Sequence, residues 1–265
     1  MLEALQYDFI QNALIAGILV SIAAGIIGSL VVVNRITFLA GGIAHSSYGG
    51  IGLAIYLGLP ILFGATVFAI TTALIIAVIT INNKKRIDSI IGIMWAFGMA
   101  LGIIFVDLTP GYNVDLMSYL FGSIIAVSNE DLVYLGILDF FIIGMVLLFY
   151  KQILAVSYDS EFAKLRGISV NFFYTLILIL AALSVVAAIK VVGLILVIAL
   201  LTIPTYLAEL YSKKLSTMMI ISSLVAVFLT LCGLVISYYY DISSGASIII
   251  VGVITLVLVK ILGKK

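Results

Sequence analysis

Two ionisable side chains lie far inside long apolar stretches of the sequence. His45 belongs to the segment FLAGGIAHSSYGGIG, and Asp139 belongs to an apolar segment at 130–150. A neutral imidazole in a dry environment can ligate a metal ion or relay a proton, and a carboxylate can share either task. Each residue also has a structural alternative, in which the imidazole bonds a backbone carbonyl and the carboxylic acid is protonated or bonds a hydroxyl. The residue types therefore predict a divalent-cation site or a proton relay.

Polar and small residues follow the histidine. Ser46 comes directly after His45 and Tyr48 lies three residues on, and we expect both to line a path for a metal ion. Gly49 and Gly50 belong to a dense glycine cluster, which indicates a helix that is broken or can bend beside a cavity. The segment thus predicts a metal pathway with a hinge next to it.

A proline predicts a second hinge. Pro204 interrupts the apolar segment LLTIPTYLAELY, where it removes one backbone hydrogen bond and kinks a helix. We expect Thr202 and Thr205 to bond the carbonyls that the proline frees.

The composition places all of these residues in a membrane. The chain has 265 residues, of which 65% are hydrophobic and 9% charged, with a mean hydropathy of +1.38. A soluble domain carries about 25% charged residues, so soluble enzymes, disordered chains and nucleic-acid-binding proteins are excluded. One cysteine and one histidine exclude a disulfide framework and a multi-histidine metal centre.

The apolar runs predict an all-α polytopic membrane protein that forms a single transmembrane domain over 1–265. Because a span needs about 20 apolar residues, we expect about nine transmembrane helices, and a short segment at 114–126 that is re-entrant or interfacial. The predicted spans lie near 9–33, 36–58, 60–82, 88–107, 130–150, 170–189, 191–211, 215–237 and 243–262.

The basic residues predict the orientation. Lys and Arg are held on the cytoplasmic side. If the N-terminus is outside and the C-terminus is cytoplasmic, nine spans place twelve of the thirteen Lys and Arg residues on that side. Lys190 alone falls outside. The expected location is the cell (plasma, inner) membrane. The basic residues on the cytoplasmic side are Arg35, Lys84, Lys85, Arg86, Lys151, Lys164, Arg166, Lys213, Lys214, Lys260, Lys264 and Lys265.

A short polar helix is predicted on the cytoplasmic side between the fifth and sixth spans. Asp159 can cap its N-terminus, Glu161 suits its first turn, and Gly167 fits the position past its end. Phe162 and Leu165 form a small apolar stripe around Ala163, of the kind that docks in a groove of a partner. An ordinary structured loop on the bundle is the alternative.

The sequence lacks a phosphate-binding loop of the form G-x-x-x-x-G-K-[ST]. We therefore expect a transport subunit rather than an enzyme, without catalytic residues, and ATP hydrolysis would need a separate subunit.

Three segments resemble the permease subunit of ABC importers for divalent metals, the zinc/manganese/iron family. They are GGIAHSSYGGIG at 41–52, YDSEFAKLRGI at 158–168 and KVVGLILVIALLTIPTYLAELY at 190–211. The resemblance implies a homodimeric pore, two cytoplasmic ATP-binding-cassette subunits, and an extracytoplasmic metal-binding protein. It also implies that 158–168 is the coupling helix, and that a divalent metal ion is the cargo, with no permanently bound cofactor.

One position departs from the family pattern. The family carries an Asp one turn before the histidine, where this chain has Gly41. A weaker site, a compensating ligand such as Asp139, or a different metal would each account for this. Zinc and manganese both suit one imidazole with oxygen ligands.

Two other functions remain open from the sequence. A secondary or proton-coupled carrier would use His45 and Asp139 as a relay and would need no partner. An ABC permease for a metal chelate shares the general architecture.

Overall fold

The computed structural model describes residues 6–82, 87–110 and 116–262, and within these ranges every regular element is a helix. Long apolar runs fold as helices in a membrane because each backbone N–H and C=O is then bonded within its own segment. The helices are α1 (Asp8–Val33), α2 (Thr37–Leu57), α3 (Ile61–Asn82), α4 (Ile87–Asp107), α5 (Leu116–Phe121), the 3₁₀ turn η2 (Ile124–Ala126), α6 (Asn129–Leu148), α7 (Tyr150–Tyr158), α8 (Ser160–Leu165), α9 (Val170–Val192), α10 (Val197–Glu209), α11 (Leu215–Tyr240) and α12 (Ser244–Leu262).

Seven helices in the described residues are long and apolar enough to cross a membrane. They match seven of the nine predicted spans, namely α1, α3, α4, α6, α9, α11 and α12. The other two predicted ranges are also helical, but neither qualifies as a span. The prediction of about nine spans is therefore not supported, and the predicted orientation of the termini, which depended on all nine crossings, stays a proposal.

The two exceptions have different physical reasons. Helix α2 has 21 residues, but its histidine, serines and many glycines make it less apolar than the seven spans. Helix α10 has only 13 residues. The chain leaves helical geometry before it, at Gly193, whose φ is +80°. The predicted span at 191–211 is therefore wrong at its start, because it includes this glycine and the irregular residues after it.

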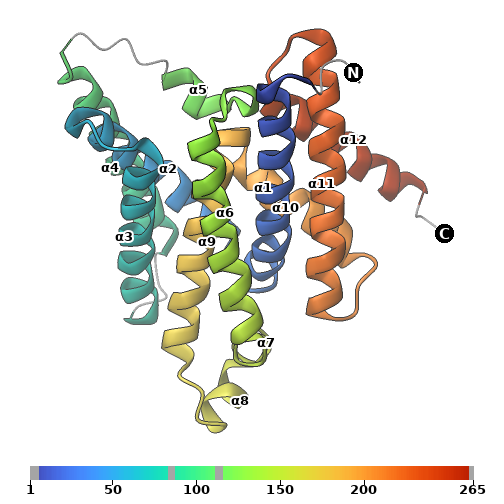
Figure 1. The fold of residues 1–265 in the computed structure, drawn as a ribbon. Coiled ribbons are helices and arrows are strands. Elements are labelled where there is room, and N and C mark those ends of the chain that lie inside the picture. Colours follow the sequence, from blue (N-terminus) through green and yellow to red (C-terminus); the bar gives the residue numbers. More distant parts are fainter. Residues whose placement is uncertain (1–5, 83–86, 111–115, 263–265) are drawn as a thin grey trace. The chain divides into compact units, whose positions relative to one another are not determined.

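The described chain divides into two compact units, each assembled from separate stretches. The unit that contains His45, here the His45 unit, comprises Val33–Asp115 and Ile142–Val186. In it α2 packs against both α3 and α4, and α7 leads into α8 (Figure 1). The prediction of a single transmembrane domain stays a prediction.

The second unit, here the Asp139 unit, comprises Met1–Val32, Leu116–Phe141 and Ala187–Lys265. In it α11 packs against α10 and α12. The predicted short segment at 114–126 forms two brief helical pieces, α5 and η2, within its described part.

Some residues used to predict orientation lie outside the described ranges. They are Lys84, Lys85, Arg86, Lys264 and Lys265.

Candidate functional site

His45 is buried in the middle of α2, with 6% of its surface exposed. Its Nδ1 atom has no hydrogen-bond partner among the described residues. The imidazole stacks on the indole of Trp95 in α4, with ring centroids 3.8 Å apart and planes inclined by 6°. A buried nitrogen left unbonded is costly unless something binds it, so Nδ1 is a candidate ligand atom.

Close packing of α2 on α4 fixes this arrangement. Ser46 donates a hydrogen bond from Oγ to the carbonyl of Met94, at 2.9 Å. Gly98 faces the backbone of Ser46, and Gly102 faces the backbone of Tyr48, so closely that a Cβ on either glycine would collide. Small residues at this spacing let helices approach within backbone contact. Gly98 and Gly102 therefore serve the close packing of α4 on α2.

The glycine cluster of α2 serves the same close approach. A Cβ on Gly49 would lie 2.9 Å from the carbonyl oxygen of Gly98, and one on Gly50 would collide with the carbonyl of Gly64 in α3. Helix α2 is continuous from Thr37 to Leu57, so the helix is not broken at these glycines. Their predicted role as a hinge is not tested by this packing.

Asp139 is the other buried ionisable residue that the sequence singled out. It lies on α6 with 3% of its surface exposed, and neither carboxylate oxygen has a hydrogen-bond partner among the described residues. It belongs to the Asp139 unit, whereas His45 and the buried Gly41 belong to the other. The pairing of Asp139 with His45 as a metal site therefore stays a prediction.

The described residues contain no group of three or more His, Cys, Asp or Glu side chains that could hold a metal ion. A cation at His45 would have to complete its coordination with oxygen atoms, such as the hydroxyls of Ser46 and Tyr48, both of which are buried. Such a sparse ligand set fits a cargo ion that binds and leaves.

The predicted cytoplasmic helix is present as α8. The Asp159 carboxylate accepts a hydrogen bond from the backbone N–H of Phe162 at 2.9 Å, and Gly167 has a φ of +74° just past the end. Both predicted end signals are thus confirmed. Ala163 is fully buried, whereas Leu165 is 87% exposed and Phe162 is 47% exposed.

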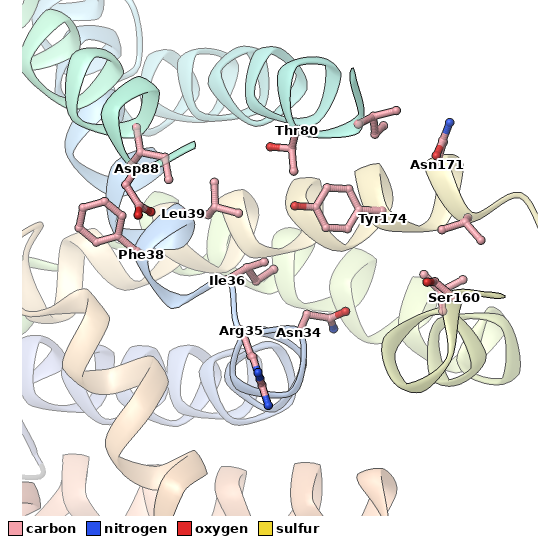
Figure 2. Close-up of a pocket in the computed structure, with 14 residues that line it drawn as sticks. Asn34, Arg35, Ile36, Phe38, Leu39, Thr80, Asp88, Ser160, Asn171 and Tyr174 are labelled. Atoms are coloured by element: carbon pink, nitrogen blue, oxygen red, sulfur yellow. The ribbon is translucent and has the colours of Figure 1, made fainter. Parts of the chain in front are cut away.

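A cavity of about 610 Å³ lies in the His45 unit, between the start of α2 and the start of α8 (Figure 2). It is lined by Arg35 and Ile36 just before α2, by Leu39 in the first turn of α2, and by Ser160, the first residue of α8. Tyr174 of α9 also lines it. The same cavity therefore adjoins the helix that carries His45 and the exposed helix α8.

Pro204 is buried inside α10, which continues through it. The prediction for its threonines is wrong in detail. Thr202 bonds the carbonyl of Ile198 and Thr205 bonds that of Leu201, whereas the proline frees the carbonyl of Leu200. The predicted hinge at Pro204 is not tested by these contacts.

Sequence reasoning missed a cluster in the Asp139 unit. Lys190 at the end of α9 forms an ion pair with Asp131 of α6 at 3.2 Å and lies over the ring of Tyr119. Beside it, the backbone N–H of Ser123 bonds the carbonyl of Lys190, and that of Leu194 bonds the carbonyl of Tyr119. The break between α9 and α10 is thus paired with the end of α5 and with Ser123 just after it.

Sequence reasoning also missed Trp95. A signal was available, because Trp95 precedes Gly98 by three residues and so shares its helix face.

Comparison with known proteins gives a consistent result. Residues 6–263 match the ABC 3 transport family. A membrane protein of Synechocystis sp. is 44% identical, over 95% of this chain and 89% of that protein. The manganese transport system membrane protein MntC of Halalkalibacterium halodurans is 34% identical, over 94% of this chain and 85% of that protein. The solved structure of PsaBC from Streptococcus pneumoniae in complex with Fab is similar with a TM-score of 0.88 and 33% identity, over 97% of this chain and 93% of that one.

Proposed function

Since this chain belongs to the ABC 3 transport family, we propose that it is the membrane-spanning permease subunit of an ATP-driven importer of divalent metal ions. The observation that carries the proposal is the family match over 6–263. Relatives named as manganese transport membrane proteins favour manganese as the cargo, with zinc as the neighbouring choice. The chain is a multi-pass membrane protein of the cell membrane and acts as a transport subunit.

The cargo passes His45 in this proposal. Ionisable groups buried inside a membrane protein are costly, and they are found along substrate and ion pathways. This role is supported by Nδ1 of His45 and by both carboxylate oxygens of Asp139, none of which has a hydrogen-bond partner among the described residues. Ser46 and Tyr48 would supply oxygen ligands along the same path.

Metal uptake in cells tests the pathway. We expect His45→Ala to lose most Mn²⁺ uptake at an unchanged protein level, because no other imidazole exists in the chain to replace it. Ser184→Ala is a matched control, since Ser184 is also buried and its hydroxyl has no hydrogen-bond partner within the described ranges, but it is not part of the proposed path. Normal uptake by His45→Ala would remove His45 from the path.

ATP hydrolysis would take place on separate cytoplasmic subunits that dock on α8. The exposed side chains of Phe162 and Leu165 support this, because exposed apolar residues next to polar ones are typical of docking surfaces. Asp159, Glu161 and Gly167 would shape the helix that docks. The cavity of Figure 2 offers a mechanical link, since its lining includes both the start of α8 and the start of α2.

The remaining assembly follows the family. The pore is proposed to be a homodimer that receives metal from an extracytoplasmic binding protein. We also propose that the N-terminus is outside and the C-terminus cytoplasmic, which requires α2 and the stretch that contains α10 to cross in addition to the seven spans. Helix α2 would cross between α3 and α4, which pack against it and cover its polar residues.

Cysteine labelling tests the orientation. Replacing Cys232 with Ser gives a cysteine-free chain, into which Leu165→Cys introduces one exposed thiol. In cells that lack the ATPase subunit, which would otherwise cover this position, a membrane-impermeant maleimide is expected to label the thiol in inside-out vesicles and to leave it unlabelled in intact cells. The reverse pattern would place α8 outside, away from any ATPase.

A further inference from the structure

The sole tryptophan of the chain lies against the sole histidine. Trp95 and His45 form a parallel stack at 3.8 Å, with an angle of 6° between their planes. We infer that Trp95 is a positioning residue for the metal cargo, which fixes the plane of the His45 imidazole so that Nδ1 is presented edge-on. The inference rests on the proposed function, because it assumes that the cargo binds at Nδ1.

The geometry of metal binding makes the ring plane decisive. A metal bound to imidazole lies along the nitrogen lone pair, in the plane of the ring, at about 2.0–2.1 Å for zinc. The indole covers one whole face of the imidazole, so the cation approaches at the ring edge. If the ring turned about its Cβ–Cγ bond out of this plane, the lone pair of Nδ1 would point elsewhere.

Contacts on α4 hold the indole in turn. Trp95 Nε1 donates a hydrogen bond to the sulfur of Met99 at 3.1 Å, which satisfies the indole N–H within its own helix. Ile91 and Gly98 flank Trp95 on the same helix face, and each contacts α2, at Gly42 and at Ser46 respectively. Trp95 therefore occupies a fixed place in the row of α4 residues that packs on α2.

No hydrogen bond competes with this arrangement at the ligand atom. Metal-bound histidines are ordinarily oriented by a hydrogen bond from the other ring nitrogen. Here an aromatic face contributes to that orientation, and Nδ1 stays free of partners among the described residues. Because aromatic pairs contribute through their geometry as well as their buried area, the loss of the stack is expected to weaken cargo binding without removing it.

The first experiment uses Trp95 as its own reporter. Paramagnetic Mn²⁺ quenches indole emission at close range, and the purified full-length chain has one indole. We expect saturable quenching by Mn²⁺ in the wild type and none in His45→Ala. If radiolabelled Mn²⁺ binds the wild type without quenching, the metal lies away from the stack and the inference is wrong.

The second experiment separates positioning from folding. We expect Trp95→Leu to weaken the binding of radiolabelled Mn²⁺ about 2- to 12-fold, which is the contribution of an aromatic pair. Trp95→Phe retains a stacking ring and is expected to bind within about twofold of the wild type. If Trp95→Leu binds as tightly as the wild type, or if Trp95→Phe is weakened equally, the stack does not position the ligand.

Two controls make the outcomes separable. The melting temperature shows whether the Trp95→Leu chain folds. If it does not fold, the quenching of the wild type by Mn²⁺ and the Mn²⁺ affinity of Trp95→Phe decide whether Trp95 positions His45. Normal Mn²⁺ uptake by His45→Ala would refute the proposed pathway itself. A defect in His45→Ala together with normal binding by Trp95→Leu would refute only the role of Trp95.

Discussion

The exposed end of α8 offers a sharp test of partner docking. Leu165 is 87% exposed, so it contributes almost nothing to the folding of the isolated chain. If it is buried in a groove of an ATPase subunit, full burial contributes about 1.5–3 kcal/mol. At about 1.4 kcal/mol for each tenfold change, this corresponds to about 10- to 150-fold in affinity. Leu165→Asp is expected to weaken association by at least this factor, because it also places a charge in the groove.

Co-purification and a binding titration measure this effect. The cognate ATPase subunit is titrated against the reconstituted permease carrying Leu165→Asp, with Leu165→Met as the matched control that keeps an apolar side chain of similar volume. Melting temperature is expected to be unchanged in both variants. If Leu165→Asp bound the ATPase as tightly as the wild type, α8 would not be the docking element.

The other predictions concern packing and conformation. Gly98→Ala is expected to lower the melting temperature, because its Cβ would collide with the backbone of Ser46. Gly92→Ala on the same helix is the control, since its Cβ meets nothing within 4 Å, and it is expected to be neutral or stabilising. Equal effects of the two substitutions on the melting temperature would contradict the close approach of α4 to α2. A double-mutant cycle of Lys190→Met and Asp131→Asn is expected to give a coupling free energy of unfolding of about 1 kcal/mol, since both side chains are largely buried. If the two substitutions had additive effects on the free energy of unfolding, the ion pair would not contribute to stability. Gly167→Pro is expected to abolish ATPase association and leave membrane insertion intact, because proline cannot adopt a φ of +74°; retained co-purification would count against the role of α8.

Most of the fold could be predicted because apolar run length is a direct physical signal. A run that excludes charges for about 20 residues forms a span whatever its neighbours are, so the prediction for 9–33 agrees closely with α1. The same signal is weaker where neighbouring helices replace lipid. Helix α2 can carry a histidine and serines because α3 and α4 pack against it. The irregular chain after Gly193 is satisfied by backbone bonds to a distant segment, which a local window cannot detect.

The candidate site likewise contains features that the sequence predicts and features that it does not. Local chemistry predicted the cap of α8 correctly, because Asp159 and its partner at Phe162 are three residues apart. The stack of His45 on Trp95 joins residues fifty positions apart and depends on the register between two helices. Hydropathy is insensitive to that register, so the residue type and depth of His45 identified it as a candidate but did not pair it with Trp95.

The two compact units are finished at different times as the chain leaves the ribosome. All stretches of the His45 unit have been synthesised by Val186, whereas the Asp139 unit needs α10, α11 and α12 as well. The carbonyls of Tyr119 and Leu120 receive their N–H donors only when Leu194 and Ile195 arrive, 75 residues later. Until then these carbonyls have to be solvated by water, lipid headgroups or the insertion machinery, so the end of α5 must settle late in membrane insertion.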